Sequence, residues 1–395
     1  MISWTRQFSL PVEPPQEAVF DTIAAAHGTS LVSWLIDAHQ DAIASMSDGL
    51  IEFLRNWTKS SVSFGTVWNI AFGRTQLALK EGRLDIGDVA ARVGIRLAEC
   101  GHPGHWTASV APAPFMVGRS LIKNVTHVEV NIAGADSSRI TLRCKDGRTV
   151  AMHRTIDSSW TDAGDGRLRW VGYQQGFVLL ARDSLPDDVG TRPTLGQCRP
   201  VDAVDSGMEA VFADGLALLR ELAPQYVPWV TRAVHGVVVC SIEEPFHLVS
   251  GSWEDIPGFI HISSPHSAVD IAEILVHEAA HQYFYLLQRV GDIDDGSDRT
   301  LYWSPPIRMK RPLSRILMAF HALTNVLQVY RAVRAAGGAD APYVEANEPI
   351  LLEAIRALDA PLRGNPALTN FGRGLYEPLA KLLPDFDSEP IVAAT

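Results

Sequence analysis

The sequence predicts an α+β protein with a helical N-terminal region, an antiparallel β meander and a mainly helical C-terminal region. Three observations support this. Apolar residues recur at helical spacing up to about residue 100, and short β-branched segments alternate with turn residues between about 106 and 182. After residue 200, long apolar segments return to helical spacing. At 395 residues the chain can bury a sizeable core and form more than one subdomain.

Composition and charge exclude several classes of protein. Hydrophobic residues make up 47% of the chain and the formal net charge is −11, which disfavours a nucleic-acid partner. Four cysteines are widely spaced without a CxxC pair, so neither a disulfide framework nor a zinc cluster is expected. The N-terminus lacks the apolar core of a signal peptide, and we expect no segment of the sequence to be apolar enough to span a bilayer. We therefore expect a cytoplasmic protein without a membrane partner.

The chain divides into three predicted regions. Residues 1–100 form a helical N-terminal region after an extended, proline-containing start at residues 1–15. Residues 101–200 contain the antiparallel β region, with strands at 127–132, 140–144, 149–153 and 177–181, and then a Pro- and Asp-rich linker at 183–200. Residues 201–395 form the metal-binding region, with strands at 233–240, 247–250 and 258–263 and helices at 206–222, 268–287, 313–335, 343–358 and 368–383.

The predicted helix at 268–287 carries the pattern His-Glu-x-x-His. Ser267 is a plausible N-cap, and the run has no Pro or Gly. His277 and His281 are one turn apart, so both imidazoles can face one metal ion, and Glu278 can reach a metal-bound ligand or hold one of the histidines. Burying three such side chains without a partner would cost stability. The pattern therefore predicts a metal site on a zincin-like helix, without naming the reaction.

A third ligand is needed, because zinc and iron centres usually take three protein ligands and keep open positions. Positions 284 and 287 hold Phe284 and Leu287, which rules out the metzincin continuation. The next long helix, 313–335, has no acidic residue to serve as a gluzincin ligand, but it has His321. His321 shares a polar stripe with Asn325 that either faces solvent or lines a wet cleft opposite His277 and His281. We predict the second arrangement.

Four cations precede or begin this helix: Arg308, Lys310, Arg311 and Arg315. In an acidic protein, such a cluster beside a metal helix indicates a wall that binds a carboxylate, because the planar guanidinium group binds carboxylates through two hydrogen bonds. Some of these cations could instead pair with the acidic loop at 292–298.

The segment resembles the HExxH-type peptide β-hydroxylases of ribosomal peptide natural-product biosynthesis. The resemblance covers mainly residues 258–335 and rests on the helix motif together with Trp303-Ser304-Pro305, Arg308 and Arg311-Pro312-Leu313. It implies an iron(II)- and 2-oxoglutarate-dependent dioxygenase that uses O₂ to hydroxylate Cβ of a residue in a precursor peptide. A separate leader-peptide-binding protein is a possible partner.

The resemblance also implies roles for individual residues. His277, His281 and His321 would hold iron, and Arg308 or Arg311 would anchor the distal carboxylate of 2-oxoglutarate, with Asn325 as a further cofactor contact. Glu278 would then orient a ligand rather than act as a base.

Two other interpretations remain open at this point. The first is a zinc-dependent metallopeptidase in which Glu278 is the general base that activates water. The second is a non-catalytic peptide-binding partner that keeps a vestigial site. The β meander at 106–182 is a candidate for the capture of a substrate peptide by strand addition.

Overall fold

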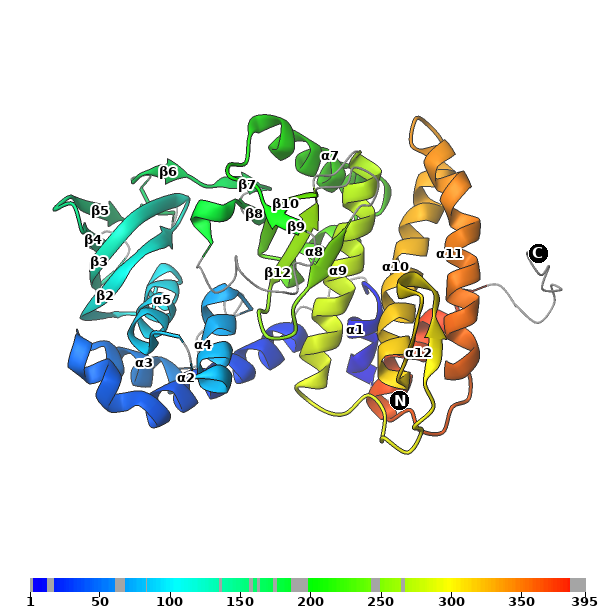
Figure 1. Cartoon of the computed structure of the whole chain (residues 1–395), viewed down its shortest axis with the longest axis horizontal. Helices are drawn as coiled ribbons and strands as arrows, with labels where there is room; N and C mark the ends of the chain where they lie inside the picture. The colour runs from blue at the N-terminus through cyan, green and yellow to red at the C-terminus, as the bar shows by residue number, and fades with distance from the viewer. Residues whose placement is uncertain are drawn as a thin grey trace. The chain divides into compact units, whose positions relative to one another are not determined.

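The structure is a computed structural model and confirms a mixed α and β architecture (Figure 1). It describes residues 3–12, 18–60, 68–82, 84–134, 137–155, 159–161, 164–172, 176–185, 198–242, 249–263 and 267–383. Internal contacts divide the chain into two compact units. The helical unit comprises Met1–Phe20, Asp214–Val230 and Ser267–Thr395, and the sheet unit comprises Asp21–Ala213 and Thr231–His266.

The first sheet of the sheet unit is the predicted antiparallel meander. Its order is β1-β2-β3-β4-β5, with β6 pairing β3. The strands are β1 (Ser47–Asp48), β2 (Gly104–Val117), β3 (Ser120–Ile132), β4 (Arg139–Cys144), β5 (Thr149–His153) and β6 (Gly166–Arg167). Along β4, Ile140 and Leu142 are fully buried while Arg139 and Arg143 are exposed, so this strand shows the alternation of a sheet with one covered face.

Helices of the same unit cover that buried face. The predicted helical region before residue 100 forms α2 (Ala18–Met46), α3 (Leu50–Thr58), α4 (Ile70–Glu81) and α5 (Ile86–Glu99). Helices α3 and α5 pack against β2. The packing is close: a Cβ atom on Gly94 of α5 would lie 2.7 Å from the ring of Trp106 on β2. Glycine therefore allows this helix to approach the sheet.

The second sheet is mixed, which differs from the predicted meander. Its order is β11-β12-β10-β8-β7, with β9 pairing β10, and β10 runs parallel to both β8 and β12. The strands are β7 (Arg169–Val171), β8 (Phe177–Leu180), β9 (Cys198–Pro200), β10 (Gly236–Ile242), β11 (Ser250–Ser252) and β12 (Phe259–Ser263). Assigning 177–181 to the meander was therefore wrong. All four residues of β8 are buried, as expected of a strand covered on both faces.

The helical unit consists mainly of helices. They are η1 (Ser3–Thr5), α1 (Arg6–Ser9), α9 (Ala268–Gln288), α10 (Leu313–Ala336), α11 (Ala341–Leu362) and α12 (Asn370–Ala380). A two-stranded hairpin of β13 (Tyr302–Ser304) and β14 (Met309–Arg311), linked by η4 (Pro305–Ile307), precedes α10. Figure 1 shows α9, α10 and α11 side by side, and α10 packs against both neighbours. Helices α7 (Ser206–Leu222) and α8 (Tyr226–Ala233) have residues in both units.

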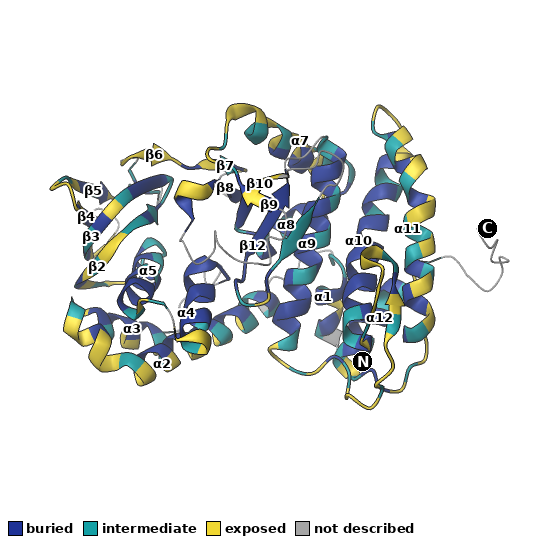
Figure 2. Ribbon diagram, viewed as in Figure 1, coloured by how far each residue is buried: buried dark blue, intermediate teal, exposed yellow. Residues whose placement is uncertain are grey.

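The metal-motif helix begins where the sequence predicts. The Ser267 hydroxyl oxygen accepts a hydrogen bond from the backbone N–H of Asp270 at 3.3 Å, as an N-cap does. The Asp270 carboxylate in turn accepts from the Ser267 hydroxyl at 2.8 Å. Most of α9 and α10 is buried, whereas α11 has an exposed outer face (Figure 2). These two helices are therefore the core of the unit.

Some sequence expectations need correction. The start of the chain is helical at η1 and α1 rather than extended, and the predicted strand at 247–250 and linker at 183–200 lie partly outside the described residues. Two helices, Val19–Met46 and Leu313–Ala336, are long and apolar enough to cross a bilayer by length and composition, contrary to the sequence expectation. Core helices pass the same test, and 83% of the relevant part of α10 is buried inside the structure.

Candidate metal centre

The two histidines of the motif lie on one face of α9. The ring centroids of His277 and His281 are 4.7 Å apart, with the ring planes nearly perpendicular. Both residues are half-buried, whereas Glu278 is 1% exposed and points into the core. The helix therefore presents its histidine pair on a partly open face and keeps the intervening carboxylate in the interior, as the 3.6-residue period requires.

The same face carries two further polar residues that the sequence analysis missed. Glu273 lies four residues before His277 and Tyr285 lies four residues after His281, so all four side chains share one face of the helix. The Glu273 carboxylate accepts hydrogen bonds from Tyr330 of α10 at 2.5 Å and from Tyr343 of α11 at 3.2 Å. Burial raises the pKa of Glu273, although these hydroxyl groups and His277 oppose the shift. The spacing from His277 was the signal that could have identified Glu273.

His321 of α10 is fully buried and its tautomer is fixed. Its Nε2 atom lies 2.9 Å from the carbonyl oxygen of Ser9, and because a carbonyl only accepts, Nε2 must carry the proton. The lone pair is then on Nδ1, which is buried and has no hydrogen-bond partner. Burial lowers the pKa of His321 to about 4, although the carbonyls of Ser9, Phe8 and Ala280 oppose the shift. His321 is therefore a neutral imidazole packed against α9.

The polar stripe of α10 is neither at the surface nor in a wet cleft. His321, Thr324 and Asn325 have no exposed surface, and the carbonyl of Ser9 in α1 lies against His321 and Asn325. Asn325 donates to the carbonyls of Ser9 at 2.9 Å and His321 at 2.8 Å, and its amide oxygen accepts from the Tyr226 hydroxyl at 2.9 Å. Both amide N–H groups are thus used inside the protein. Asn325 therefore packs around His321 inside the protein, and it has no exposed surface from which to contact a cofactor.

Four cationic or imidazole groups surround His281. Burial lowers its pKa well below the ordinary value, and electrostatic interactions with His277, His321, Arg315 and Arg311 lower it further. Since such effects fall off with distance, these groups lie close together although they come from α9, α10 and β14. His321, Arg311 and Arg315 thus interact electrostatically with His281 of the histidine pair.

The arginines near the site are not equivalent. Arg311 is half-buried, and burial, followed by the charge of Arg315, lowers its pKa while Tyr285 opposes the shift. Arg308 is exposed at the tip of the hairpin, where its φ of 50° places it in the left-handed region. Lys310 is also exposed. The structure therefore places Arg311 and Arg315 beside His281 and leaves Arg308 on the surface.

The donor types at this site suit a transition metal. Nδ1 of His281 and Nδ1 of His321 are both buried without a hydrogen-bond partner, so neither nitrogen is occupied by a described protein group. The Nε2–H of His321 is held by a backbone carbonyl, which is the support that ligating histidines usually have. Within the ranges that the structure describes, no three His, Cys, Asp or Glu side chains already form a ligating group. These residues therefore supply suitable donor atoms for a metal, but the described residues do not form a complete coordination shell.

Comparison with known proteins adds no family assignment. No family model matches the chain, and no curated protein is significantly similar to it. The chemistry must therefore be inferred from the residues and their geometry.

Proposed function

We propose that this chain is an iron(II)- and 2-oxoglutarate-dependent oxygenase that hydroxylates Cβ of a residue in a ribosomally made peptide. The observation that carries the proposal is the proximity of His277, His321, Arg311 and Arg315 to His281. A set of imidazoles beside a pair of arginines offers both a metal site and a carboxylate site. A metallopeptidase needs no such arginine pair.

Three histidines would hold the metal. Imidazole is a suitable ligand for iron, and three protein ligands leave positions for a 2-oxo acid and O₂. His281 and His321 are kept neutral by burial, as ligands must be. With iron bound, the site supplies the oxidation in which O₂, 2-oxoglutarate and a peptide C–H become succinate, CO₂ and a peptide C–OH.

Arg311 and Arg315 would bind the distal carboxylate of 2-oxoglutarate. Their side chains are half-buried and close enough for the charge of Arg315 to lower the pKa of Arg311. Two adjacent guanidinium groups repel each other, and a carboxylate placed between them relieves that repulsion. The planar donors also fix the orientation of the bound acid through paired hydrogen bonds.

The two glutamates of α9 would support the ligands. Glu278 is buried, which favours a role in holding the helix and its histidines over direct proton transfer. Glu273 is held by Tyr330 and Tyr343 and lies one turn before His277, so its charge can orient that imidazole. The hydrogen bonds of Asn325 to the His321 and Ser9 carbonyls keep His321 in place.

The hairpin that carries Arg311 supports a peptide as substrate. Trp303 is 52% exposed and lies on β13, and Met309 is 53% exposed and lies on β14, the strand that ends at Arg311. Exposed apolar side chains on an open two-stranded ribbon are typical of surfaces that bind extended peptides. Because the ribbon continues directly to Arg311, a peptide held there would lie beside the proposed metal.

The experiment is incubation of candidate precursor peptides with the protein, iron(II), 2-oxoglutarate and O₂. Mass spectrometry should show a gain of one oxygen at Cβ, with formation of succinate. Peptide cleavage that zinc supports without 2-oxoglutarate would overturn the proposal in favour of a metallopeptidase.

A further inference from the structure

The hairpin of β13 and β14 has an open edge. Its sheet has two strands, and no further strand pairs with either of them among the residues that the structure describes. β13 packs against α10 and α11, so the far edge of β14 (Met309–Arg311) is the more accessible of the two. This strand contains no proline, and the N–H and C=O groups of an unpaired edge can bind another extended chain. The hairpin therefore offers a site for a third strand.

The pairing of the hairpin determines which side chains share a face. Trp303 lies directly opposite Lys310, and Tyr302 lies opposite Arg311. Directly opposed residues point to the same face of a sheet, and neighbours along a strand point to opposite faces. Trp303 and Lys310 therefore form an outer face, where both are exposed, whereas Arg311 and Tyr302 are half-buried on the inner face. The inner face leads to the metal centre, because Arg311 interacts electrostatically with His281.

Exposed apolar side chains gather on and beside this hairpin. Seven large hydrophobic residues are exposed in the described part of the chain, and four of them lie between positions 301 and 309: Leu301, Trp303, Ile307 and Met309. Single exposed apolar residues are ordinary, but a cluster of them indicates an interaction site. Because Trp303 is paired with Lys310, the outer face combines apolar surface with a positive charge.

The acidic loop that precedes the hairpin does not neutralise its outer cations. Asp298 accepts hydrogen bonds from the Tyr302 hydroxyl at 2.6 Å and from the Asn365 amide at 2.9 Å. Two further aspartates of the loop accept from its own backbone N–H groups at 3.1 and 2.9 Å. Within the described residues, no carboxylate forms an ion pair with Arg308 or Lys310. The hairpin thus presents positive charge to a ligand, although the chain as a whole is acidic.

We propose that β14 binds an acidic peptide as a third strand. One acidic side chain of the peptide pairs with Lys310 on the outer face. Because side chains alternate along a strand, the next residue of the peptide points inwards beside Arg311 and towards the histidines. The preferred substrate therefore has an acidic residue directly beside the residue that is modified. This last assignment rests on the proposed oxygenase function, whereas the binding of an acidic strand does not.

The test is fluorescence anisotropy with the whole chain, without added iron or 2-oxoglutarate, and the labelled peptide Thr-Val-Glu-Leu-Glu-Val-Thr. The comparison peptide has lysine in place of both glutamates. The acidic peptide should bind about fivefold more tightly or better, because lysine replaces an exposed ion pair by a repulsion between like charges. The difference should shrink as the salt concentration rises. Equal affinity for the two peptides, or no binding of either, would overturn the proposal.

Reversal of one charge on β14 should reverse the preference. Lys310→Glu should bind the acidic peptide about fivefold more weakly than the wild type does, and it should bind the lysine peptide more tightly. Lys145→Glu, at an exposed lysine between β4 and β5, is the matched control and should behave as the wild type. Both lysines are exposed, so both variants should keep the circular dichroism spectrum. An unchanged preference in Lys310→Glu protein would contradict the assignment of Lys310.

Hydrogen exchange followed by mass spectrometry locates the bound peptide. The backbone amides of β14 should become protected when the acidic peptide binds. Protection of another sheet edge, such as β5, without β14 would overturn the proposal. A protein that binds the acidic peptide at β14 but forms no iron(II) complex with 2-oxoglutarate contradicts only the oxygenase function. A protein that forms this complex but does not prefer the acidic peptide contradicts only the binding of an acidic strand.

Discussion

The Nε2 atom of His321 lies 2.9 Å from the carbonyl oxygen of Ser9, although 312 positions separate the two residues in the sequence. The contact fixes the imidazole as the tautomer with its lone pair on Nδ1. It also closes the N-terminal helix α1 over α10, and the Ser9 hydroxyl continues the connection by donating to the Leu375 carbonyl of α12 at 2.7 Å. The third histidine of the proposed metal set is therefore oriented by the start of the chain.

His321→Ala should abolish iron(II) binding, because it removes one of the three proposed ligands. The substitution also leaves the buried Ser9 carbonyl with one hydrogen bond fewer, so the unfolding free energy should fall by about 1–3 kcal/mol. Metal titration followed by circular dichroism separates the two effects. His105→Ala, at an exposed histidine of β2, is the matched control and should bind iron normally. Retained iron binding in folded His321→Ala protein would remove His321 from the ligand set.

Asn325→Leu should lower stability more than Tyr226→Phe does. The leucine leaves the Ser9 and His321 carbonyls and the Tyr226 hydroxyl without their shared partner, whereas phenylalanine removes only one bond at 2.9 Å. Each buried hydrogen bond that is lost costs about 0.5–1.5 kcal/mol, so the loss of three exceeds the loss of one. Urea denaturation gives the two free energies directly. Similar values for both variants would show that Asn325 does not hold this part of the core together.

Arg311→Ala should weaken 2-oxoglutarate binding about tenfold or more, because it removes a paired, charged hydrogen bond. Arg308→Ala should have little effect, since Arg308 is exposed at the hairpin tip. The affinity of the iron(II)-loaded protein for 2-oxoglutarate, obtained by titration, checks both expectations. The opposite ranking would transfer the carboxylate-binding role to Arg308.

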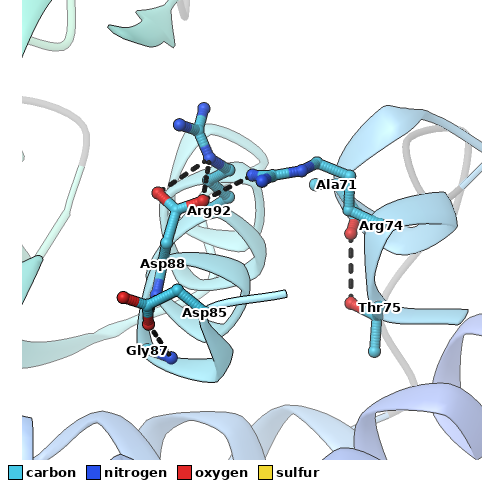
Figure 3. A network of polar contacts seen from close by, with 7 residues as sticks. All are labelled: Ala71, Arg74, Thr75, Asp85, Gly87, Asp88 and Arg92. Carbon is cyan, nitrogen blue, oxygen red and sulfur yellow. Dashed lines mark hydrogen bonds and ion pairs between the residues drawn. The ribbon is translucent and has the colours of Figure 1, made fainter. Parts of the chain in front are cut away.

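Asp88→Asn should be among the most destabilising single changes in the sheet unit. It removes a charge that Arg74 and Arg92 share (Figure 3), and breaking a buried ion pair typically costs about 3–5 kcal/mol. The matched control is Asp146→Asn, whose side chain is 58% exposed and pairs with Arg148, and it should cost less than about 1 kcal/mol. Chemical denaturation measures the unfolding free energy of both variants. Equal losses of unfolding free energy would show that the buried Asp88 pairs are no more stabilising than the exposed Asp146 pair.

Stability should fall as the pH is lowered from 6.5 towards 4. Burial holds the pKa of His261 at about 4, and burial followed by the charge of Arg96 does the same for His235, against an ordinary value of 6.5. In this range the unfolded chain therefore binds more protons than the folded protein, so acid favours unfolding. Each histidine can contribute up to about 1.4 kcal/mol per pH unit. Thermal unfolding at pH 7, 6 and 5 measures the slope, and the double variant His235→Gln/His261→Gln should reduce it, while the lowered pKa values of His281 and His321 keep the rest.

The sequence predicted the elements that have a strong local signal. Helix α9 begins at the Ser267 cap and α10 spans the predicted apolar run, because capping and apolar spacing are written in neighbouring residues. The meander was also identified, except that β8 belongs to the second sheet. An apolar strand such as β8 carries no alternation, so its partner cannot be read from local pattern.

The environment of the candidate site depended on contacts that no local pattern encodes. Spacing along one helix gave His277 and His281, but it could not show that Ser9 covers His321 or that two tyrosines hold Glu273. The sequence of this four-cation cluster could not predict that Arg311 is half-buried and Arg308 is exposed. The burial of the His321 stripe likewise depended on a helix at the opposite end of the chain.

The most direct test of the oxygenase proposal is anaerobic titration of the protein with iron(II) and then 2-oxoglutarate, followed by visible absorption spectroscopy. A 2-oxo acid chelated to iron(II) gives a weak visible charge-transfer band, and we expect this band in the wild-type protein and its loss in His321→Ala. A wild-type protein that gives no band under these conditions, and that cleaves peptides with zinc alone, would contradict the proposal.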